Sequence, residues 1–243
     1  MSSLSMPRAL DLFAGTHSFT KQAQELGWDV ISVDLSPKYS PTHVANILDW
    51  DFKQYPRGYF QFLWCSPPCT LLSIAPAHLF TALQRQERAE ASLEVVEKMI
   101  EILNWYQAPW YCIENPKSSA LWRHLQGFET VTVSYCMYSD WGYKKDTKLA
   151  TNVPFEPKLC RGQCGWVREI LDEQTGKKHR WHQSVAKQGV SQHTRGTTVQ
   201  QTRHTRDELY RVPPKLIQDI LEAVGQVESG EGGVQGTPRG PVA

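Results

Sequence analysis

The sequence lacks long apolar runs and contains little cysteine. No stretch of its 243 residues approaches the roughly 20 apolar residues that a membrane-spanning helix needs, so we expect no membrane span. Six cysteines are too few for a disulfide scaffold of this size, which favours a reducing compartment, the cytoplasm or the nucleus. Residues 1–8 also lack the basic-then-apolar layout of a secretory signal, in line with an intracellular location.

Net charge is almost absent as well, yet the charges are unevenly distributed. The formal net charge is only +1. Residues 144–211 hold fourteen Lys or Arg against seven Asp or Glu, whereas the rest of the chain holds twelve against eighteen. A basic C-terminal third predicts a face for a polyanion, although a basic surface that is merely solvated has the same composition.

A strand–helix–strand pattern opens the chain. Residues 9–13 and 28–33 predict short apolar strands, and residues 18–26 predict the helix between them. The apolar runs and periodicity that follow predict strands at 60–64, 110–113 and 130–135, the last antiparallel, and a long helix at about 83–106. Alternation of this kind predicts an α/β fold with a mostly parallel, doubly wound sheet.

The composition divides the chain into four parts. We expect a core over residues 1–150, a small basic insert with Cys and His over 151–206, a helix over 207–225 that returns to the core, and a Gly-rich disordered tail over 226–243. Within the insert, residues 167–171 and 179–185 predict a hairpin.

The predicted strand ends carry the residues of a ligand site. The carboxyl ends of parallel strands form the ligand crevice in such sheets, and acids stand at three of them: Asp11, Asp34 and Asp49. The first turn contains one glycine, Gly15, instead of the three that cradle a dinucleotide pyrophosphate. A nucleoside without pyrophosphate fits better, and S-adenosylmethionine is the candidate. Asp34 is suited to bind ribose hydroxyls, and a turn-forming aspartate is the alternative.

A thiol and a carboxyl end two further strands. Cys69 follows the stiff Pro67-Pro68 loop, and Glu114-Asn115 ends another strand. A thiol in a crevice near positive charge has a lowered pKa and acts as a nucleophile, and a facing carboxyl can deliver a proton. An apolar filler is the alternative for Cys69 taken alone. We interpret three other cysteines as core residues of that kind: Cys65, Cys112 and Cys136.

Three motifs together resemble a known family. The segment DLFAG at 11–15, Pro67-Pro68-Cys69 and Glu114-Asn115, in this order and spacing, resemble the DNA cytosine-5 methyltransferases, most closely the short forms of phages and iridoviruses. The resemblance runs from about Pro7 to Val224. It implies the S-adenosylmethionine-dependent methyltransferase fold and transfer of a methyl group to C5 of a flipped-out cytosine.

The resemblance also implies roles for individual residues. Cys69 would attack C6 of cytosine and form a covalent adduct, while Glu114 would hold and protonate N3. Asp34 would bind the ribose, and Asp49 would approach the adenine amino group. The residues implied for cofactor binding are Asp11, Phe13, Ala14, Gly15, Thr16, Asp34, Asp49, Ser66 and Pro67.

The chain departs from the family pattern on the nucleic-acid side of the site. Lysines, among them Lys145 and Lys148, stand where arginines are usual near the base, and lysine lacks the bidentate fork of arginine. We expect Asn115 and these two lysines near the base. Arg195 and Arg203 of the insert are expected on the phosphates or base edges of DNA, and so small an insert predicts loose sequence specificity.

The insert also contains four potential metal ligands. Cys160-x3-Cys164 and His179-x2-His182 have the composition of a zinc site, and the predicted hairpin would bring the two halves together. The spacing of the histidines is shorter than in common zinc motifs. Two ordinary cysteines and two surface histidines are the alternative.

Other functions remain open at this point. RNA is a possible substrate, because tRNA-directed members of the family share these motifs. An amino-methyltransferase would need an aromatic residue where Cys69 stands. A nucleic-acid-binding remnant would keep the fold without catalysis, although intact Cys69 and Glu114 argue against decay. The sequence sets no oligomeric state.

Overall fold

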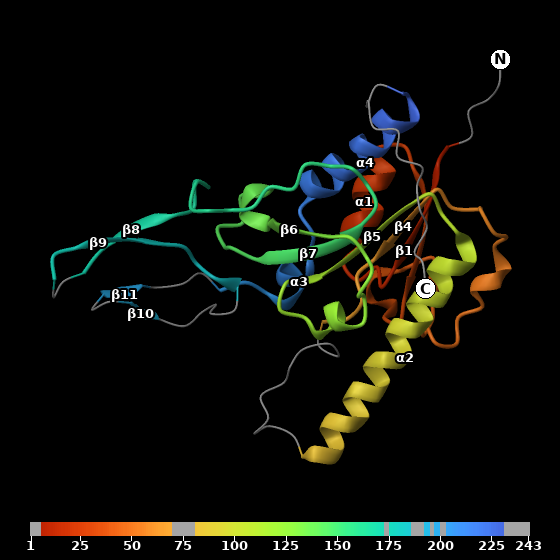
Figure 1. The fold of residues 1–243 in the computed structure, drawn as a ribbon, viewed down its shortest axis with the longest axis horizontal. Helices are drawn as coiled ribbons and strands as arrows, with labels where there is room; N and C mark the ends of the chain where they lie inside the picture. The colour runs from red at the N-terminus through yellow and green to blue at the C-terminus, as the bar shows by residue number, and fades with distance from the viewer. Residues whose placement is uncertain are drawn as a thin grey trace.

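A seven-stranded sheet forms the centre of the molecule (Figure 1). The computed structural model describes residues 6–69, 81–172, 175–185, 192–194, 197–199 and 203–230. The strands of the sheet are β1 Arg8–Leu12, β2 Asp29–Asp34, β3 His43–Val44, β4 Phe62–Cys65, β5 Trp110–Pro116, β6 Thr130–Ser134 and β7 Asp146–Thr151. The helices are α1 Ser18–Glu25, α2 Ala82–Tyr106, α3 Arg206–Tyr210 and α4 Pro214–Glu228.

The sheet is parallel over most of its width and antiparallel at one edge. Its order is β3-β2-β1-β4-β5-β7-β6. The first five strands pair in parallel, whereas β7 runs antiparallel to both β5 and β6. The predicted α/β fold and the antiparallel strand near 130–135 are therefore confirmed. Strand β7 has no clear sequence signal, because Asp146 and Lys148 interrupt its apolar residues.

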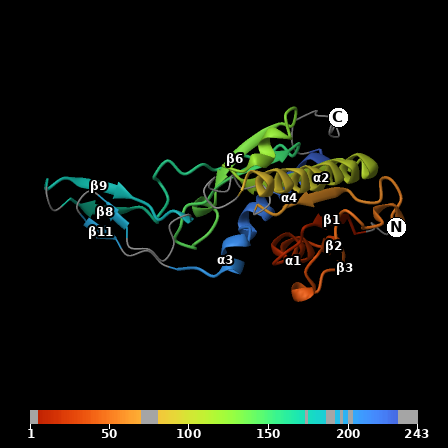
Figure 2. The ribbon, with the colours of Figure 1, turned by 90° about the horizontal axis from the view of Figure 1, so that it is seen from below.

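Helices cover both faces of the sheet. Alternate residues of a strand point to opposite faces, so Phe62 joins a core cluster with Phe19 of α1 and Ile217 of α4, while Leu63 joins another with Met99 of α2. Figure 2 shows α2 and α1 on opposite sides of the sheet. In doubly wound folds of this kind, ligands bind at the carboxyl ends of the parallel strands.

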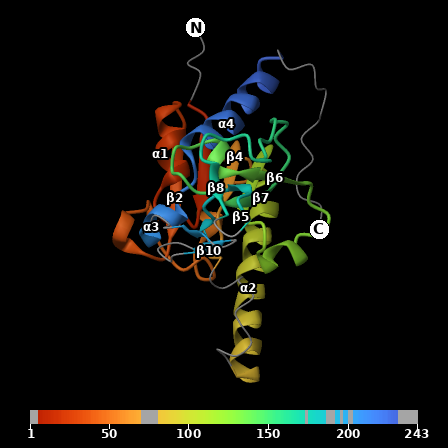
Figure 3. The same ribbon diagram turned by 90° about the vertical axis from the view of Figure 1, so that its left-hand side faces the viewer.

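The long helix α2 agrees with the prediction for 83–106. A capping box begins it, since Thr81 Oγ1 accepts the Gln84 backbone N–H and Gln84 Oε1 accepts the Thr81 backbone N–H. Val96 and Leu103 of its predicted apolar face are buried, whereas Leu93 is 40% exposed. The N-terminal half of α2 extends past the sheet (Figure 3), which leaves Leu93 without a core to cover it.

The insert projects from the sheet (Figures 1 and 2). Its strands are β8 Arg168–Leu171, β9 Lys178–Trp181, β10 Gln192–Thr194 and β11 Thr197–Val199. β8 pairs antiparallel with β9, which confirms the hairpin predicted for 167–185. β9 ends at Trp181, earlier than predicted, because Gln183 and Val185 form backbone hydrogen bonds with Lys144 instead.

The C-terminal segment returns to the core through α4. Its buried side chains are Leu216, Ile217, Ile220, Leu221, Ala223 and Val224. The helix continues to Glu228, past the predicted start of the disordered tail at Gln226, because Val227 still packs against the core. Residues 231–243 of that tail lie outside the described residues.

Two observations concern membrane spans and disulfides. Among the described residues, no helix combines the length and apolar character that crossing a membrane requires. All six cysteines are free thiols. The sulfurs of Cys160 and Cys164 lie 3.5 Å apart without being bonded to each other.

We expect Ile217→Ala to lower the free energy of unfolding by about 2–5 kcal/mol, because removal of this buried side chain leaves a cavity between α4 and the sheet. Glu222→Ala on the exposed side of the same helix is the control, with a change below about 0.5 kcal/mol. Urea unfolding followed by circular dichroism measures both. Equal effects would show that α4 is not part of the core.

Candidate active site

A cavity of about 470 Å³ lies at the carboxyl ends of β1, β2, β4 and β5. It collects nearly all of the residues predicted for the cofactor and the chemistry. Those that line it are Asp11, Phe13, Ala14, Gly15, Thr16, Asp34, Ser66, Pro67, Cys69, Glu114, Asn115 and Lys145. Segments distant in sequence meet here because neighbouring parallel strands end at the same edge. The Cys69 thiol and the Glu114 carboxyl therefore share one volume.

The loop after β1 has an unusual backbone. Phe13, Gly15 and His17 have φ of 61°, 47° and 60°, the left-handed region that favours glycine. Asp34 holds this loop, since Oδ2 accepts the Gly15 N–H at 2.8 Å and Oδ1 accepts the Ser36 N–H at 2.8 Å. The turn-forming role of Asp34 is thus present, and each oxygen has a second lone pair that these hydrogen bonds leave unused.

Asp11 is buried at the base of the cavity. Its Oδ2 accepts hydrogen bonds from Thr20 Oγ1 at 2.6 Å and Thr20 N at 3.3 Å. Burial raises the pKa of Asp11 to about 7, against the opposing effect of these hydrogen bonds. The contacts of Asp11 therefore attach β1 to α1.

The loop that carries Cys69 is fixed to the sheet by hydrogen bonds. Asn115 Nδ2 donates to the Pro67 carbonyl at 2.7 Å, and Trp64 Nε1 donates to Ser66 Oγ at 2.8 Å. Asn115 is buried, and its Oδ1 has no hydrogen-bond partner among the described residues. An acceptor in this position, on the cavity lining, is available to a ligand that donates.

The electrostatic surroundings of Cys69 differ from the prediction. Burial raises the pKa of the Cys69 thiol, and the Glu114 carboxylate adds to the rise. The cations of Lys145 and Arg206 oppose it without cancelling it. The expected lowering of the pKa below its ordinary value is therefore wrong, because desolvation outweighs the two cations.

Tyr135 forms a hydrogen bond with Glu114, the candidate proton donor. Its hydroxyl donates to Glu114 Oε1 at 2.8 Å, and both residues are buried. Burial and the neighbouring Glu114 raise the pKa of Tyr135 well above its ordinary value, so the phenol keeps its proton. The sequence gives no signal for this role of Tyr135, which resembles any other core aromatic until the sheet order is known.

The two lysines predicted near the base diverge. Lys145 is buried, lines the cavity, and donates from Nζ to the Leu209 carbonyl at 3.1 Å. Lys148 is not part of the lining, and its Nζ lies 5.2 Å from the Trp122 ring. Residues three apart in an extended segment point to opposite faces, so only one of the two can face the cavity.

Other predicted residues do not reach the cavity lining. Asp49 is exposed in a turn closed by its own N–H and the Asn46 carbonyl, because β3 ends after two residues. Arg203 is exposed and is also outside the lining. Arg195 lies outside the described residues.

The C-terminal segment supplies lining residues that the sequence analysis missed. These are Arg206, Asp207, Tyr210 and Val212, which meet Leu35, Lys38 and Tyr39 after β2. Lys38 Nζ lies 2.5 Å from Asp207 Oδ2, an ion pair between residues 169 positions apart. The Val212 N–H donates to Ser18 Oγ at 3.0 Å. No local pattern signals contacts over such separations.

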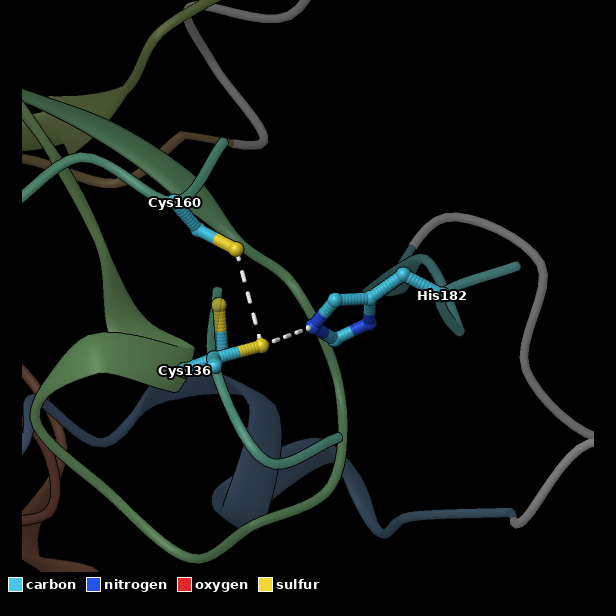
Figure 4. A group of neighbouring side chains, drawn as sticks. Cys136, Cys160 and His182 are labelled. Atoms are coloured by element: carbon cyan, nitrogen blue, oxygen red, sulfur yellow. Dashed lines mark hydrogen bonds between the residues drawn. The ribbon is translucent and has the colours of Figure 1, made fainter. Parts of the chain in front are cut away.

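A second cluster of side chains (Figure 4) has no member in the cavity lining. Four ligand atoms within 4.8 Å of one another could hold a metal ion; they belong to Cys136, Cys160, Cys164 and His182. The predicted ligand set is corrected at one position. His179 Nε2 instead lies 3.8 Å from Asp172 Oδ2, since residues three apart near the end of a strand diverge. Cys136, interpreted as a core residue, takes the fourth place.

The strand order and the cavity define a doubly wound α/β protein with a ligand site at the carboxyl ends of its parallel strands. More particularly, it belongs to the DNA (cytosine-5)-methyltransferase family. It is 31% identical over 224 residues to the probable DNA (cytosine-5)-methyltransferase of Frog virus 3 (isolate Goorha), and the match covers 88% of this chain and 99% of that relative. No protein-family model matches the sequence.

Solved methyltransferases are more distantly similar. The Entamoeba histolytica methyltransferase EhMeth is 13% identical, with a TM-score of 0.46 over 64% of this chain and 56% of that chain. The S. pombe Dnmt2 methyltransferase is 16% identical, with a TM-score of 0.38 over 70% of this chain and 58% of that chain. The chain thus spans little more than half the length of these two structures.

We expect alkylation of Cys69 by iodoacetamide to show an apparent pKa above the ordinary value for cysteine, since burial opposes the thiolate. Lys145→Met removes a cation and should move the profile to still higher pH, whereas Glu114→Gln removes an anion and should move it lower. Lys148→Met, outside the lining, is the control. Mass spectrometry of the Cys69 peptide at a series of pH values gives the rates, and coincident Lys145→Met and wild-type profiles would contradict the assignment.

Proposed function

We propose that the chain is a DNA cytosine-5 methyltransferase that acts through a covalent adduct between Cys69 and the target cytosine. The observation that carries the proposal is that Cys69 and Glu114 line the same cavity as Gly15 and Asp34. A nucleophile, a proton donor and a nucleoside crevice on one edge of the sheet can reach a single pyrimidine ring at the same time.

S-adenosylmethionine is the methyl donor in this proposal, and its sulfonium supplies an electrophilic methyl group. Leu35 is 70% exposed on the cavity lining next to Asp34, which offers an adenine ring an apolar surface to cover. Asp34 has lone pairs left for ribose hydroxyls. The loop around Gly15 lacks a pyrophosphate cradle, as suits a nucleoside ligand.

Cys69 and Glu114 act at two atoms of the same ring: Cys69 adds to C6, and Glu114 exchanges a proton with N3. The Cys69 thiolate forms a bond to C6, the C5–C6 double-bond pair moves to C4–C5, and the C4–N3 pair moves to N3. Glu114, a carboxylate in the free protein, takes up a proton with the bound base and gives it to N3. S-adenosylmethionine, when bound, would supply the methyl group to C5, and its sulfur would leave as a thioether with the electron pair of the broken S–C bond. A base such as water removes the C5 proton, the C5–C6 double bond re-forms, and Cys69 leaves as thiolate while Glu114 regains its proton from N3.

Asn115 and Lys145 are the proposed contacts to the rest of the base. The unpartnered Oδ1 of Asn115 accepts from an amino or N–H group, and Lys145 offers a cation beside Cys69. Lys145 also stabilises the thiolate that attacks, because an adjacent positive charge favours the ionised form.

DNA is the proposed substrate because the relative in Frog virus 3 is named as a probable DNA (cytosine-5)-methyltransferase. C5 and C6 are inaccessible in a stacked duplex, and flipping a base out costs a few kcal/mol. The basic segment 144–211 contributes Lys145 and Arg206 to the cavity itself, and its other cations are suited to phosphates. An intracellular location, where nucleic acid and cofactor are both present, belongs to this proposal.

The test offers the protein two matched substrates. Duplex DNA pools with 5-fluorocytosine in place of cytosine, and RNA pools with the same base, are incubated with S-adenosylmethionine. A base cannot remove fluorine from C5 in the way that it removes a proton, so Cys69 cannot be released. We therefore expect an adduct with DNA that survives denaturing electrophoresis. Cys69→Ser should abolish it, while Cys65→Ala, which removes a fully buried thiol, should not.

The outcomes separate the alternatives. An adduct with RNA alone would identify RNA as the substrate in place of DNA. An adduct that persists in Cys69→Ser would refute the assigned nucleophile. Methylation of unmodified DNA without any adduct would refute the covalent mechanism. No adduct and no methyl transfer with either nucleic acid would favour a binding remnant.

We expect Tyr135→Phe to lower kcat roughly 10–100-fold, the size expected when a carboxyl loses a hydrogen bond of this kind. The KM for S-adenosylmethionine should stay unchanged, because Tyr135 contacts Glu114 and is not on the cavity lining. Tyr138→Phe is the control on the same segment. Steady-state methyl transfer from labelled cofactor measures both, and equal kcat values in the two variants would remove the positioning role of Tyr135.

A further inference from the structure

The cluster outside the cavity is assembled from three separate segments (Figure 4). Cys136 lies in the 3₁₀ turn Tyr135–Met137 after β6, Cys160 and Cys164 lie in the loop after β7, and His182 follows β9. The two loop sulfurs are 3.5 Å apart, and Cys164 Sγ lies 3.1 Å from His182 Nε2. Three thiols and an imidazole converge here, although the chain has only six cysteines.

Hydrogen bonds orient the ligand atoms of this cluster inward. His182 Nδ1 lies 3.0 Å from the Gln183 carbonyl, so a proton on Nδ1 leaves the Nε2 lone pair directed at the sulfurs. The Gly162 N–H lies 3.4 Å from Cys160 Sγ and donates to it, which stabilises a thiolate. Gly162 has φ of +97°, a conformation that suits glycine and turns the loop between the two cysteines.

We propose that Cys136, Cys160, Cys164 and His182 form a structural zinc site. With Zn–S near 2.3 Å and Zn–N near 2.0 Å, tetrahedral coordination separates ligand atoms by about 3.5–3.8 Å. The observed separations, 3.1 and 3.5 Å for two pairs and at most 4.8 Å for all, need only small side-chain adjustments. Thiolate and imidazole ligands exclude Ca²⁺ and Mg²⁺, which take oxygen, and four protein ligands close the site to substrate.

The position of the site indicates what the ion holds together. The β8–β9 hairpin projects from the core (Figure 2), and a two-stranded hairpin alone is marginally stable in water. Ligation of His182 joins the end of this hairpin to Cys136, whose neighbour Tyr135 donates to Glu114. Lys144 strengthens the same junction, since its Nζ donates to the Cys160 carbonyl at 3.3 Å and its N–H to the Gln183 carbonyl at 2.8 Å.

Zinc ligation therefore supplies free energy that fixes the insert against the core. The link to the orientation of Glu114 rests on the proposed function, whereas the zinc site itself does not. Its test accordingly reads metal content and local structure without any methyl transfer, and it can succeed or fail independently of the enzyme assignment.

The experiment uses the untagged full-length chain, purified with a phosphine reductant and without chelators or metal columns. Inductively coupled plasma mass spectrometry should find one zinc ion per chain. Cys164→Ser and His182→Ala should weaken zinc binding at least roughly tenfold in competition with a chromogenic chelator. His179→Ala, the matched histidine variant in the same hairpin, should retain the ion with wild-type affinity.

Two further measurements keep the test decisive if a variant fails to fold. Co²⁺ exchanged into the wild-type chain should give the visible bands of tetrahedral thiolate coordination. Removal of zinc from the wild-type chain by chelator should speed hydrogen exchange in β8, β9 and segment 135–137, while α1 stays protected. A zinc-free wild-type chain, or zinc lost from His179→Ala but kept in His182→Ala, would each overturn the proposal.

Discussion

The parallel pairing of β4 with β5 is the constraint on which the active site depends. Cys65 lies opposite Ile113 in this pair, so the chain leaves both strands at the same edge of the sheet. Asn115 then fastens the two exits together through its 2.7 Å hydrogen bond to the Pro67 carbonyl. A buried hydrogen bond is strong in the low-dielectric interior, and this one sets where the loop to Cys69 starts relative to the strand end that carries Glu114.

Basic residues of the C-terminal third affect the pKa of Cys69 at this edge of the sheet. Burial alone would leave Cys69 a poor nucleophile, because desolvation raises the pKa of its thiol. The opposing cations, Lys145 and Arg206, both come from the basic segment 144–211. Two cations of this basic segment thus oppose the effect of burial on the Cys69 thiol.

The sequence was informative wherever structure is local. Short apolar runs bounded by turn residues indicated β1, β2, β4 and β5, because buried strands of a parallel sheet are apolar on both faces. Parallel strands end at one edge, so the residues that follow them, including Cys69 and Glu114, could be expected to share a crevice. The prediction failed for Asp49, since a two-residue β3 turns the chain away before it reaches that crevice.

Only the tertiary structure decided which distant residues complete each site. Tyr135 meets Glu114 because β6 joins the same sheet as β5 through β7. Asp207 meets Lys38 because the segment after α3 is held against α1 by the hydrogen bond from the Val212 N–H to Ser18 Oγ. Cys136 joins the insert cysteines because the chain before Cys160 runs along the end of β6, where the Cys160 N–H donates to Ser134 Oγ. The sequence by itself determined the strands, the turn residues and the chemical groups at their ends, which depend on near neighbours. It could not determine these partnerships, because contacts between segments far apart in the chain leave no periodicity or spacing to detect.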